Sequence, residues 1–144
     1  MFSDVFLTDS SSAEKNIIYL DRAFDSGFLS AASGVCETGL AARPCRDLSV
    51  VYTPLFGAGY RLVPEILKSA GFKKIFVQKE QSVPNGEFPG IRTPNPEYAE
   101  NLALAIETAK EQNSELVIGT DADADRIGAV SYTHLRAHET GAYL

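Results

Sequence analysis

Three short apolar runs stand out along the chain. They occupy residues 48–53 (LSVVYT), 74–78 (KIFVQ) and 115–120 (ELVIGT), and each is rich in β-branched or aromatic residues. Runs of this length and composition, bounded by turn-forming residues, are typical of buried β-strands. We therefore predict three strands.

Residues 60–72, between the first two runs, have the periodicity of a helix. Their apolar positions recur at helical spacing: Leu62, Val63, Ile66, Leu67 and Ala70. Pro64 fits the first turn, where a missing N–H costs little, and Gly71 is suited to end the helix. The preceding Gly-Ala-Gly, residues 57–59, is interpreted as a strand-to-helix turn.

A second helix is predicted over residues 95–113, with Asn95 as its N-cap and Pro96 at its first helical position. A long loop with four prolines, residues 79–96, precedes it. Such a loop is uncommon unless it is functional or packed by its own side chains.

The first 47 residues are less regular. Residues 12–24 have the composition of a short helix, with Ile17, Ile18 and Leu20 as its apolar residues. Residues 25–47 are rich in Gly, Ser and Ala without a clear period, which indicates loop, linker or imperfect helix.

Strands that alternate with helices predict an α/β fold, here a three-layer α/β/α domain with a small, mostly parallel sheet. Residues 126–130 (RIGAV) are predicted to pair antiparallel to the third strand. Ligand sites in such sheets gather at the carboxyl ends of the strands. Asp121 directly follows the third run, so this edge of the sheet is the candidate site.

The composition narrows the classes of function. The chain has 144 residues, 44% of them apolar, and a formal net charge of −6, which argues against a nucleic-acid surface. It contains no run of 18 apolar residues, so we expect no membrane-spanning helix. Cys36 and Cys45 fit neither a CxxC motif nor a disulfide framework, which favours a cytoplasmic location.

The candidate chemistry lies in the sequence GTDADADRIGAV. Asp121, Asp123 and Asp125 alternate, and Arg126 follows. Carboxylates this close repel one another unless a cation offsets their charge, and oxygen ligands suit Mg²⁺ or Ca²⁺. In an extended loop, residues two apart point the same way, so three carboxylates can converge on one ion.

Three other interpretations of these aspartates are open at this point. An EF-hand shares the D-x-D-x-D opening but requires Gly and Glu where Arg126 and Tyr132 stand. A haloacid dehalogenase-type phosphatase also has D-x-D after a strand, but with Thr or Val at the position of Asp125. The last alternative is an acidic, solvent-exposed turn without a ligand.

Three segments in sequence order resemble the second domain of the α-D-phosphohexomutases, the phosphoglucomutase and phosphomannomutase superfamily. They are VYTPLFGAGYRLVPEILKSAGF (51–72), GEFPGIRTPNPE (86–97) and GTDADADRIGAV (119–130). They are similar to the family's VYTPLHGTG segment, its F-P-x3-PNPE segment and its D-P-D-x-D-R magnesium loop. Each motif alone is weak, but their order and spacing together favour this family over the alternatives.

The resemblance implies an intramolecular phosphotransferase that interconverts hexose 1-phosphate and hexose 6-phosphate through a phosphoserine and a bisphosphate intermediate. It implies that Asp121, Asp123 and Asp125 hold Mg²⁺ together with the serine phosphate, and that Arg126 lies close to the phosphate. The ion would neutralise charge on the moving phosphoryl group. Ala122 replaces the family's usual proline, and Phe56 stands where many members have histidine.

The family's phosphoserine pattern, Thr-Ala-Ser-His-Asn-Pro, does not occur in the sequence, nor does its Arg-x-Ser-Gly-Thr phosphate clamp. We therefore expect a phosphohexomutase fragment with no catalytic residue of its own, inactive when alone. Residues 1–47 would be a remnant of a preceding domain or a linker, 48–130 the second domain, and 131–144 a foreign, adaptor-derived tail. The rival hypothesis is a stand-alone cation-binding α/β module without catalysis.

Overall fold

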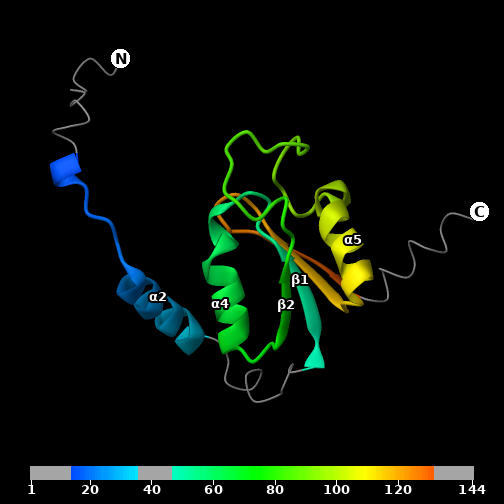
Figure 1. The fold of residues 1–144 in the computed structure, drawn as a ribbon, viewed down its shortest axis with the longest axis horizontal. Coiled ribbons are helices and arrows are strands. Elements are labelled where there is room, and N and C mark those ends of the chain that lie inside the picture. The colour runs from blue at the N-terminus through cyan, green and yellow to red at the C-terminus, as the bar shows by residue number, and fades with distance from the viewer. Residues whose placement is uncertain (1–13, 36–46, 132–144) are drawn as a thin grey trace, which may run out of the picture.

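The computed structural model describes residues 14–35 and 47–131, which contain a four-stranded sheet (Figure 1). Its strands are β1 (Ser49–Thr53), β2 (Lys74–Val77), β3 (Leu116–Thr120) and β4 (Ile127–Ser131). Their order is β2-β1-β3-β4; β1 pairs parallel to β2 and β3, and β4 pairs antiparallel to β3. The predicted strands and the antiparallel partner are confirmed.

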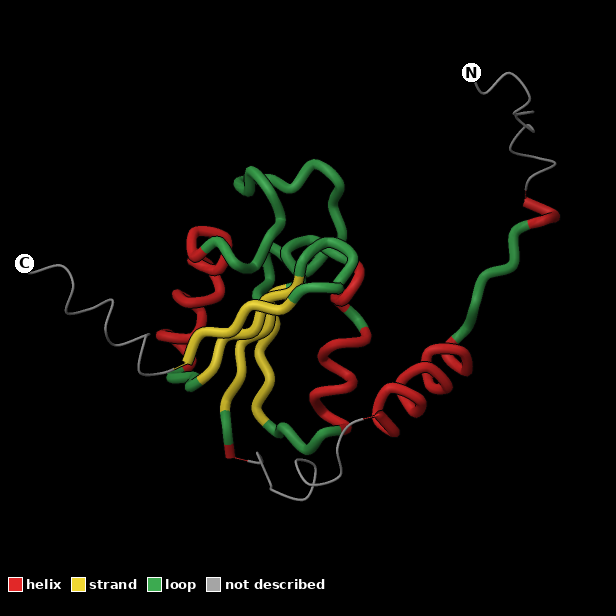
Figure 2. Tube along the Cα trace, turned by 180° about the vertical axis from the view of Figure 1, so that it is seen from behind, coloured by secondary structure: helices red, strands yellow, loops and turns green. Residues whose placement is uncertain are grey.

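Helices cover both faces of this sheet (Figure 2). Helix α4 (Leu62–Ser69) and helix α5 (Ala103–Gln112) lie on opposite sides. Val50 packs in the core on the α4 side and Val51 in the core on the α5 side, because successive side chains of a strand point to opposite faces. The prediction of a three-layer α/β/α fold with a mostly parallel sheet is confirmed.

Helix α4 ends as the sequence predicts. Gly71 has a φ of 98°, and its N–H donates to the Lys68 carbonyl at 3.0 Å. The N–H of Phe72 donates to the Leu67 carbonyl at 3.1 Å, which completes a Schellman motif. Phe72 and Leu67 both pack against the core on this side of the sheet, so the cap also fixes the path into β2.

The second helix begins later than predicted. A 3₁₀ turn, η4 (Ala99–Leu102), precedes α5, so Asn95 is not its N-cap. The Asn95 side chain instead accepts a hydrogen bond from the N–H of Glu97 at 2.9 Å and closes a local turn. Asparagine satisfies a turn two residues ahead as readily as a helix end, and this competition made the prediction wrong.

The N-terminal prediction was also wrong. The described part of the expected helix, residues 14–24, is not one helix: η1 (Glu14–Asn16) is a single 3₁₀ turn, and the next helix is α2 (Arg22–Val35). The Asp21 carboxylate caps α2 by accepting from the N–H of Ala23 at 2.9 Å. The apolar residues that suggested an earlier helix are not buried in a core: Ile18 is 86% exposed. The Asp cap was the better sequence signal for where the helix begins.

The long proline-rich loop is held by buried amides. Gln81 accepts from the Thr53 hydroxyl at 2.7 Å, and its carbonyl accepts from the N–H of Phe56 at 2.9 Å. The Asn101 amide donates to the carbonyls of Thr93 and Asn95 at 2.6 and 2.7 Å. The loop is therefore held at one end by its own Gln81 and at the other by Asn101 of η4, which explains how a loop of this length stays ordered.

No helix in the described part of the chain is long and apolar enough to cross a membrane. Cys36, Cys45 and residues 132–144 of the predicted tail lie outside the described residues. Ser131, the first residue of that predicted tail, is the last residue of β4. The proposed limits at residues 47 and 130 stay predictions.

Candidate metal centre

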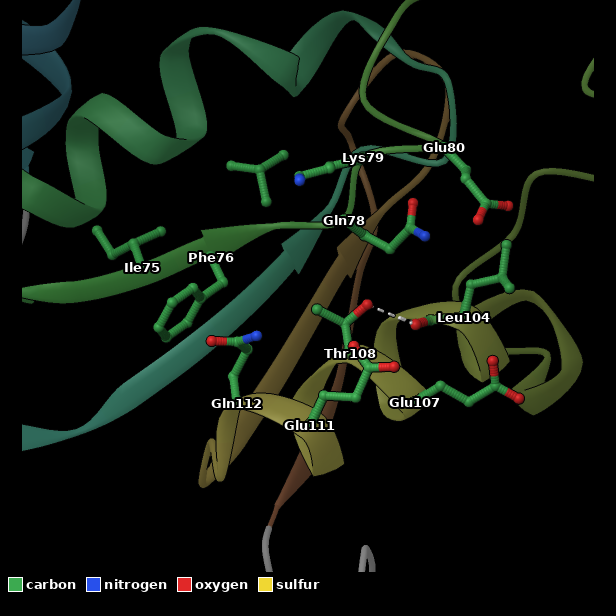
Figure 3. A pocket seen from close by; sticks show the side chains of 11 residues that line it. Ile75, Phe76, Gln78, Lys79, Glu80, Leu104, Glu107, Thr108, Glu111 and Gln112 are labelled. Carbon is green, nitrogen blue, oxygen red and sulfur yellow. Dashed lines mark hydrogen bonds between the residues drawn. The ribbon is translucent and has the colours of Figure 1, made fainter.

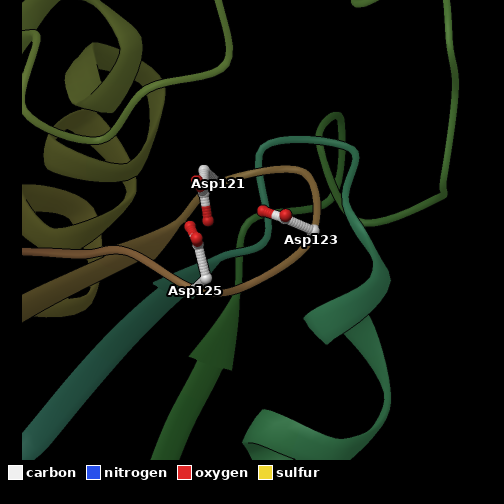
Figure 4. Close-up of side chains that lie close together, drawn as sticks. All are labelled: Asp121, Asp123 and Asp125. Atoms are coloured by element: carbon white, nitrogen blue, oxygen red, sulfur yellow. The ribbon is translucent and has the colours of Figure 1, made fainter.

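The three aspartates lie where β3 ends, at the edge of the sheet that also holds the end of β1 (Figure 4). Asp121 is buried, whereas Asp123 and Asp125 are exposed. One carboxylate oxygen from each lies within 4.8 Å of the others, and the figure shows the three side chains pointing toward one another. The sequence-predicted ligand set is thus brought together in space, in a geometry that can hold a metal ion.

A tight turn produces this convergence, and the prediction of an extended loop was wrong. The N–H of Ala124 donates to the Asp121 carbonyl at 3.2 Å, and Ala124 has a φ of 61°. The N–H of Arg126 donates to the Asp121 carboxylate at 3.1 Å. A residue in the left-handed region reverses the chain, so the aspartates face inward around the turn instead of along a strand.

A side-chain hydrogen bond and like charges together determine the electrostatics of the loop. The pKa of Asp125 is raised above its ordinary value by a side-chain hydrogen bond with Asp121 and by the negative charges of Asp123 and Asp121, while Arg126 acts in the opposite direction. The Arg126 Nε lies 3.7 Å from Asp121 and 3.9 Å from Asp125. Arg126 therefore offsets part of the charge, and a divalent cation among the carboxylates would offset more.

The Gly-Ala-Gly turn, residues 57–59, contacts the aspartate loop and supports it. The N–H of Ala58 donates to the Ala122 carbonyl at 2.8 Å. A Cβ on Gly57 would lie 2.5 Å from the Asp121 carbonyl oxygen and 2.7 Å from the Ala122 Cα. Gly57 is therefore required by close approach of two backbones, a role that sequence reasoning missed because the two segments are far apart in the chain.

A buried hydrogen bond joins the strands beneath the loop. The Tyr52 hydroxyl of β1 lies 2.8 Å from the Thr120 hydroxyl of β3. Burial raises the pKa of Tyr52 to about 12, and the bond to Thr120 partly opposes this rise. A Cβ on Gly59 would lie 2.5 Å from the Tyr52 hydroxyl, so Gly59 leaves the space in which this bond forms. This hydrogen bond therefore holds Thr120, the residue that precedes Asp121, in position.

The end of the long loop, at Pro96, packs against paired glycines of β3 and β4. Gly119 and Gly128 are register partners. A Cβ on Gly128 would lie 2.5 Å from the Pro96 carbonyl oxygen, and one on Gly119 would lie 2.5 Å from the Leu102 side chain. The long loop thus rests directly on the strands that flank the aspartates. Glycine at paired strand positions is the sequence signal for such close approach.

Comparison with known proteins agrees with this architecture. The sequence profile of the family described as "Phosphoglucomutase/phosphomannomutase, alpha/beta/alpha domain II" matches residues 28–133. A probable phosphomannomutase of Haemophilus influenzae is 36% identical over 121 residues, 84% of this chain and 24% of that protein. A phosphoglucomutase of Staphylococcus aureus strain MRSA252 is 35% identical over 107 residues, 70% of this chain and 19% of that protein.

Solved structures show the same fold. A crystal structure of a phosphoglucomutase/phosphomannomutase family protein from Burkholderia thailandensis superposes with a TM-score of 0.59 at 25% identity, over 75% of this chain and 21% of that one. A putative phosphomannomutase from Thermus thermophilus gives 0.61 at 19% identity, over 81% and 25%.

The chain spans about a fifth to a quarter of the length of these relatives. The EF-hand interpretation is excluded by the strand that leads into the aspartates, and the match to a different family removes the support for a haloacid dehalogenase-type phosphatase. The order of elements, the turn of aspartates and the profile match agree: the chain belongs to the phosphoglucomutase/phosphomannomutase family, in which it corresponds to the α/β/α domain II.

Proposed function

We propose that this chain supplies the magnesium-binding loop of a phosphohexomutase, an enzyme that interconverts hexose 1-phosphate and hexose 6-phosphate. The observation that carries the proposal is the convergence of Asp121, Asp123 and Asp125 within 4.8 Å at the carboxyl edge of the sheet. Both phosphomannomutase and phosphoglucomutase occur among the names of its relatives. A hexose phosphate is therefore the proposed substrate of the protein to which the domain contributes.

The donor set fits a hard cation. All three candidate ligands offer carboxylate oxygens, which Mg²⁺ prefers to nitrogen or sulfur. Exposed Asp123 and Asp125 leave room on the solvent side for water or a phosphate oxygen. Bound Mg²⁺ supplies charge neutralisation for a transferring phosphoryl group.

Asp121 and Arg126 have different roles in the loop. Asp121 is buried and accepts a backbone hydrogen bond from Arg126, so it anchors the turn while keeping an oxygen toward the cluster. Arg126 is 56% exposed on its side chain and is held only at 3.7 and 3.9 Å by its carboxylates. A phosphate that enters the site can therefore recruit this guanidinium, which forms stronger, bidentate bonds with phosphate oxygens.

Paramagnetic NMR tests the metal site. Mn²⁺ titrated into the ¹⁵N-labelled chain should broaden the amide signals of residues 121–126 and of Ala58, which is bonded to the loop. Asp123→Asn should remove this broadening. Glu111→Gln, which removes an exposed carboxylate from α5, is the matched control and should preserve it. Broadening centred on other acidic residues would reject the site.

A chimera tests the activity. Residues 28–133 of this chain would replace the matching segment of the S. aureus phosphoglucomutase, and conversion of glucose 1-phosphate would be assayed with Mg²⁺. We expect turnover in the chimera and a loss on the order of 10²-fold on Asp123→Ala, because a metal ligand is removed. Glu87→Ala, in the exposed loop, is the control. A well-folded chimera whose turnover is insensitive to Asp123→Ala would contradict the proposal.

A further inference from the structure

A groove of about 490 Å³ runs between β2 and α5, on the side of the domain away from β4 (Figure 3). Its floor is the half-buried edge of β2, with Ile75, Phe76 and Val77. Its wall is one face of α5, where Leu104 and Thr108 lie one turn apart. None of the residues that line it belongs to the candidate metal centre.

The strand that forms the floor has one free edge. β2 is the outermost strand in the order β2-β1-β3-β4, so among the described residues it pairs only with β1. The N–H of Gln78 donates to the Tyr52 carbonyl of β1 at 2.9 Å. Because backbone groups alternate in direction along a strand, those of Ile75 and Val77 point away from β1. An edge of this kind is a template for an added strand.

Gln78 offers a hydrogen-bond donor at this edge. The residue is only 5% exposed, and it lines the groove with its side chain directed inward (Figure 3). Its Oε1 accepts from the N–H of Gln81 at 2.8 Å, whereas its Nε2 donates to no acceptor in the described part of the chain. No buried side-chain nitrogen or oxygen of the described residues lacks a hydrogen-bond partner, so this Nε2 is open to solvent in the groove. The carbonyl of an entering chain can take the place of that water.

The charges around the groove select a basic occupant. Three carboxylates line it, from Glu80 after β2 and from Glu107 and Glu111 on α5, against the single ammonium of Lys79. Figure 3 shows them on both sides of the groove. A second copy of this chain would bring the same carboxylates against each other, which is unfavourable.

We propose that this groove binds an extended segment of a partner protein with Lys or Arg at alternate positions. The segment adds as a strand beside β2, exchanging backbone hydrogen bonds with Ile75 and Val77, while one of its carbonyls accepts from Gln78 Nε2. Alternate side chains face α5, where basic groups meet Glu107 and Glu111; the remaining side chains pack beside Ile75 and Val77 on the opposite face.

Fluorescence anisotropy with a labelled seven-residue peptide of alternating lysine and valine tests the pairing at low ionic strength. We expect saturable binding to the 144-residue chain, and none by the peptide with glutamate in place of lysine. Two further peptides carry backbone N-methyl groups on either the lysines or the valines. In strand addition only one of these sets faces β2, so one methylated peptide should lose at least about tenfold in affinity and the other should bind as before. Equal binding by both, or no saturable binding by the parent peptide, would overturn the proposal.

Protein variants test the location without disturbing the core. Glu107→Gln with Glu111→Gln should weaken peptide binding by about tenfold, because two exposed ion pairs are lost. Glu65→Gln with Glu87→Gln removes the same charge from exposed positions elsewhere and should leave the affinity within about twofold. Equal weakening by the two double variants would show attraction to net charge alone and would refute the groove as the site.

Discussion

At the scale of single residues, the aspartate loop depends on a glycine outside it. A Cβ at Gly57 would lie 2.5 and 2.7 Å from backbone atoms of Asp121 and Ala122, which cannot move without displacing the loop. We expect Gly57→Ala to lower the free energy of unfolding by about 2 kcal/mol, as overpacking does, and to weaken metal binding. Gly86→Ala, where a Cβ would meet nothing within 4 Å, should change it by less than about 0.5 kcal/mol. Urea unfolding of both variants checks this, and equal stabilities would contradict it.

Ala124 is constrained by its own backbone conformation, whereas Gly57 is constrained by its close neighbours. Its φ of 61° lies in the left-handed region, which costs an alanine about 1 kcal/mol, whereas glycine adopts it freely at some cost in chain entropy. Ala124→Gly should therefore raise the free energy of unfolding by about 0.5 kcal/mol. Ala122→Gly, in the same loop without a positive φ, should lower it. Thermal melts of the pair measure the difference, and destabilisation by both would refute the strain.

The ionisation of Asp125 makes the free energy of unfolding depend on pH. Its folded pKa is raised above the ordinary 3.8, by the hydrogen bond with Asp121 first and then by the neighbouring charges, so the folded chain holds this proton more tightly than the unfolded chain. Its contribution to the free energy of unfolding is therefore greatest below pH 3.8 and is lost as the pH rises through the folded pKa. In EDTA, Asp125→Asn should match the parent chain at low pH and exceed its stability at neutral pH.

Urea titrations across this range check the prediction, with Asp47→Asn as a control that removes one exposed negative charge outside the cluster. A constant difference between the Asp125 variant and the parent chain at every pH would contradict the assigned sign. Added Mg²⁺ should stabilise the parent chain relative to the variant, because the cation binds the folded loop and offsets the same repulsion.

At the scale of elements, local patterns predicted the regular core and failed where distant contacts decide. The period of Leu62 to Ala70 and the glycine at 71 were enough to predict α4, because helix spacing and its stop signal are both local. The start of α5 was wrong because Asn95 closes a separate turn. The start of α2 was placed too early because Asp21, its cap, follows a more apolar segment, and for residues 25–47 an imperfect helix was one of three open alternatives. A glycine within a strand signals close approach, but no local pattern identifies Leu102 as the residue that approaches Gly119.

The two helices on the α4 side should differ in what they contribute. Helix α2 has no buried residue and contacts α4 partly through the exposed ion pair of Asp25 with Arg61, whereas Leu67 of α4 packs against the sheet. We expect Leu67→Ala to cost about 2 kcal/mol and Leu29→Ala, on α2, about 0.5 kcal/mol. Chemical unfolding of both variants measures this, and equal costs would show that α2 belongs to the core.

At the scale of the whole molecule, the carboxyl edge of the sheet gathers the chemistry. The loop after β3 carries the aspartates, and the turn after β1 supports it through Ala58. The rule that sites lie at this edge predicted where to look, and the residue types predicted a hard cation. The supports could not be predicted, because Gly57 and Tyr52 act on segments far away along the chain.

The open metal site predicts that the 144-residue chain alone binds Mg²⁺ weakly and has no mutase activity. Two of the three carboxylates are exposed, and Arg126 already offsets part of their charge. Mg²⁺ gives up water reluctantly and demands near-octahedral geometry, so three carboxylates in an open site add little to its hydration shell. The resemblance assigns a further ligand to a phosphoserine whose sequence pattern this chain does not contain. Calorimetric titration with Mg²⁺, and an assay of glucose 1-phosphate conversion primed with the bisphosphate, measure both properties. Submicromolar binding, or turnover that disappears in Asp123→Ala, would show that these 144 residues already form a complete site.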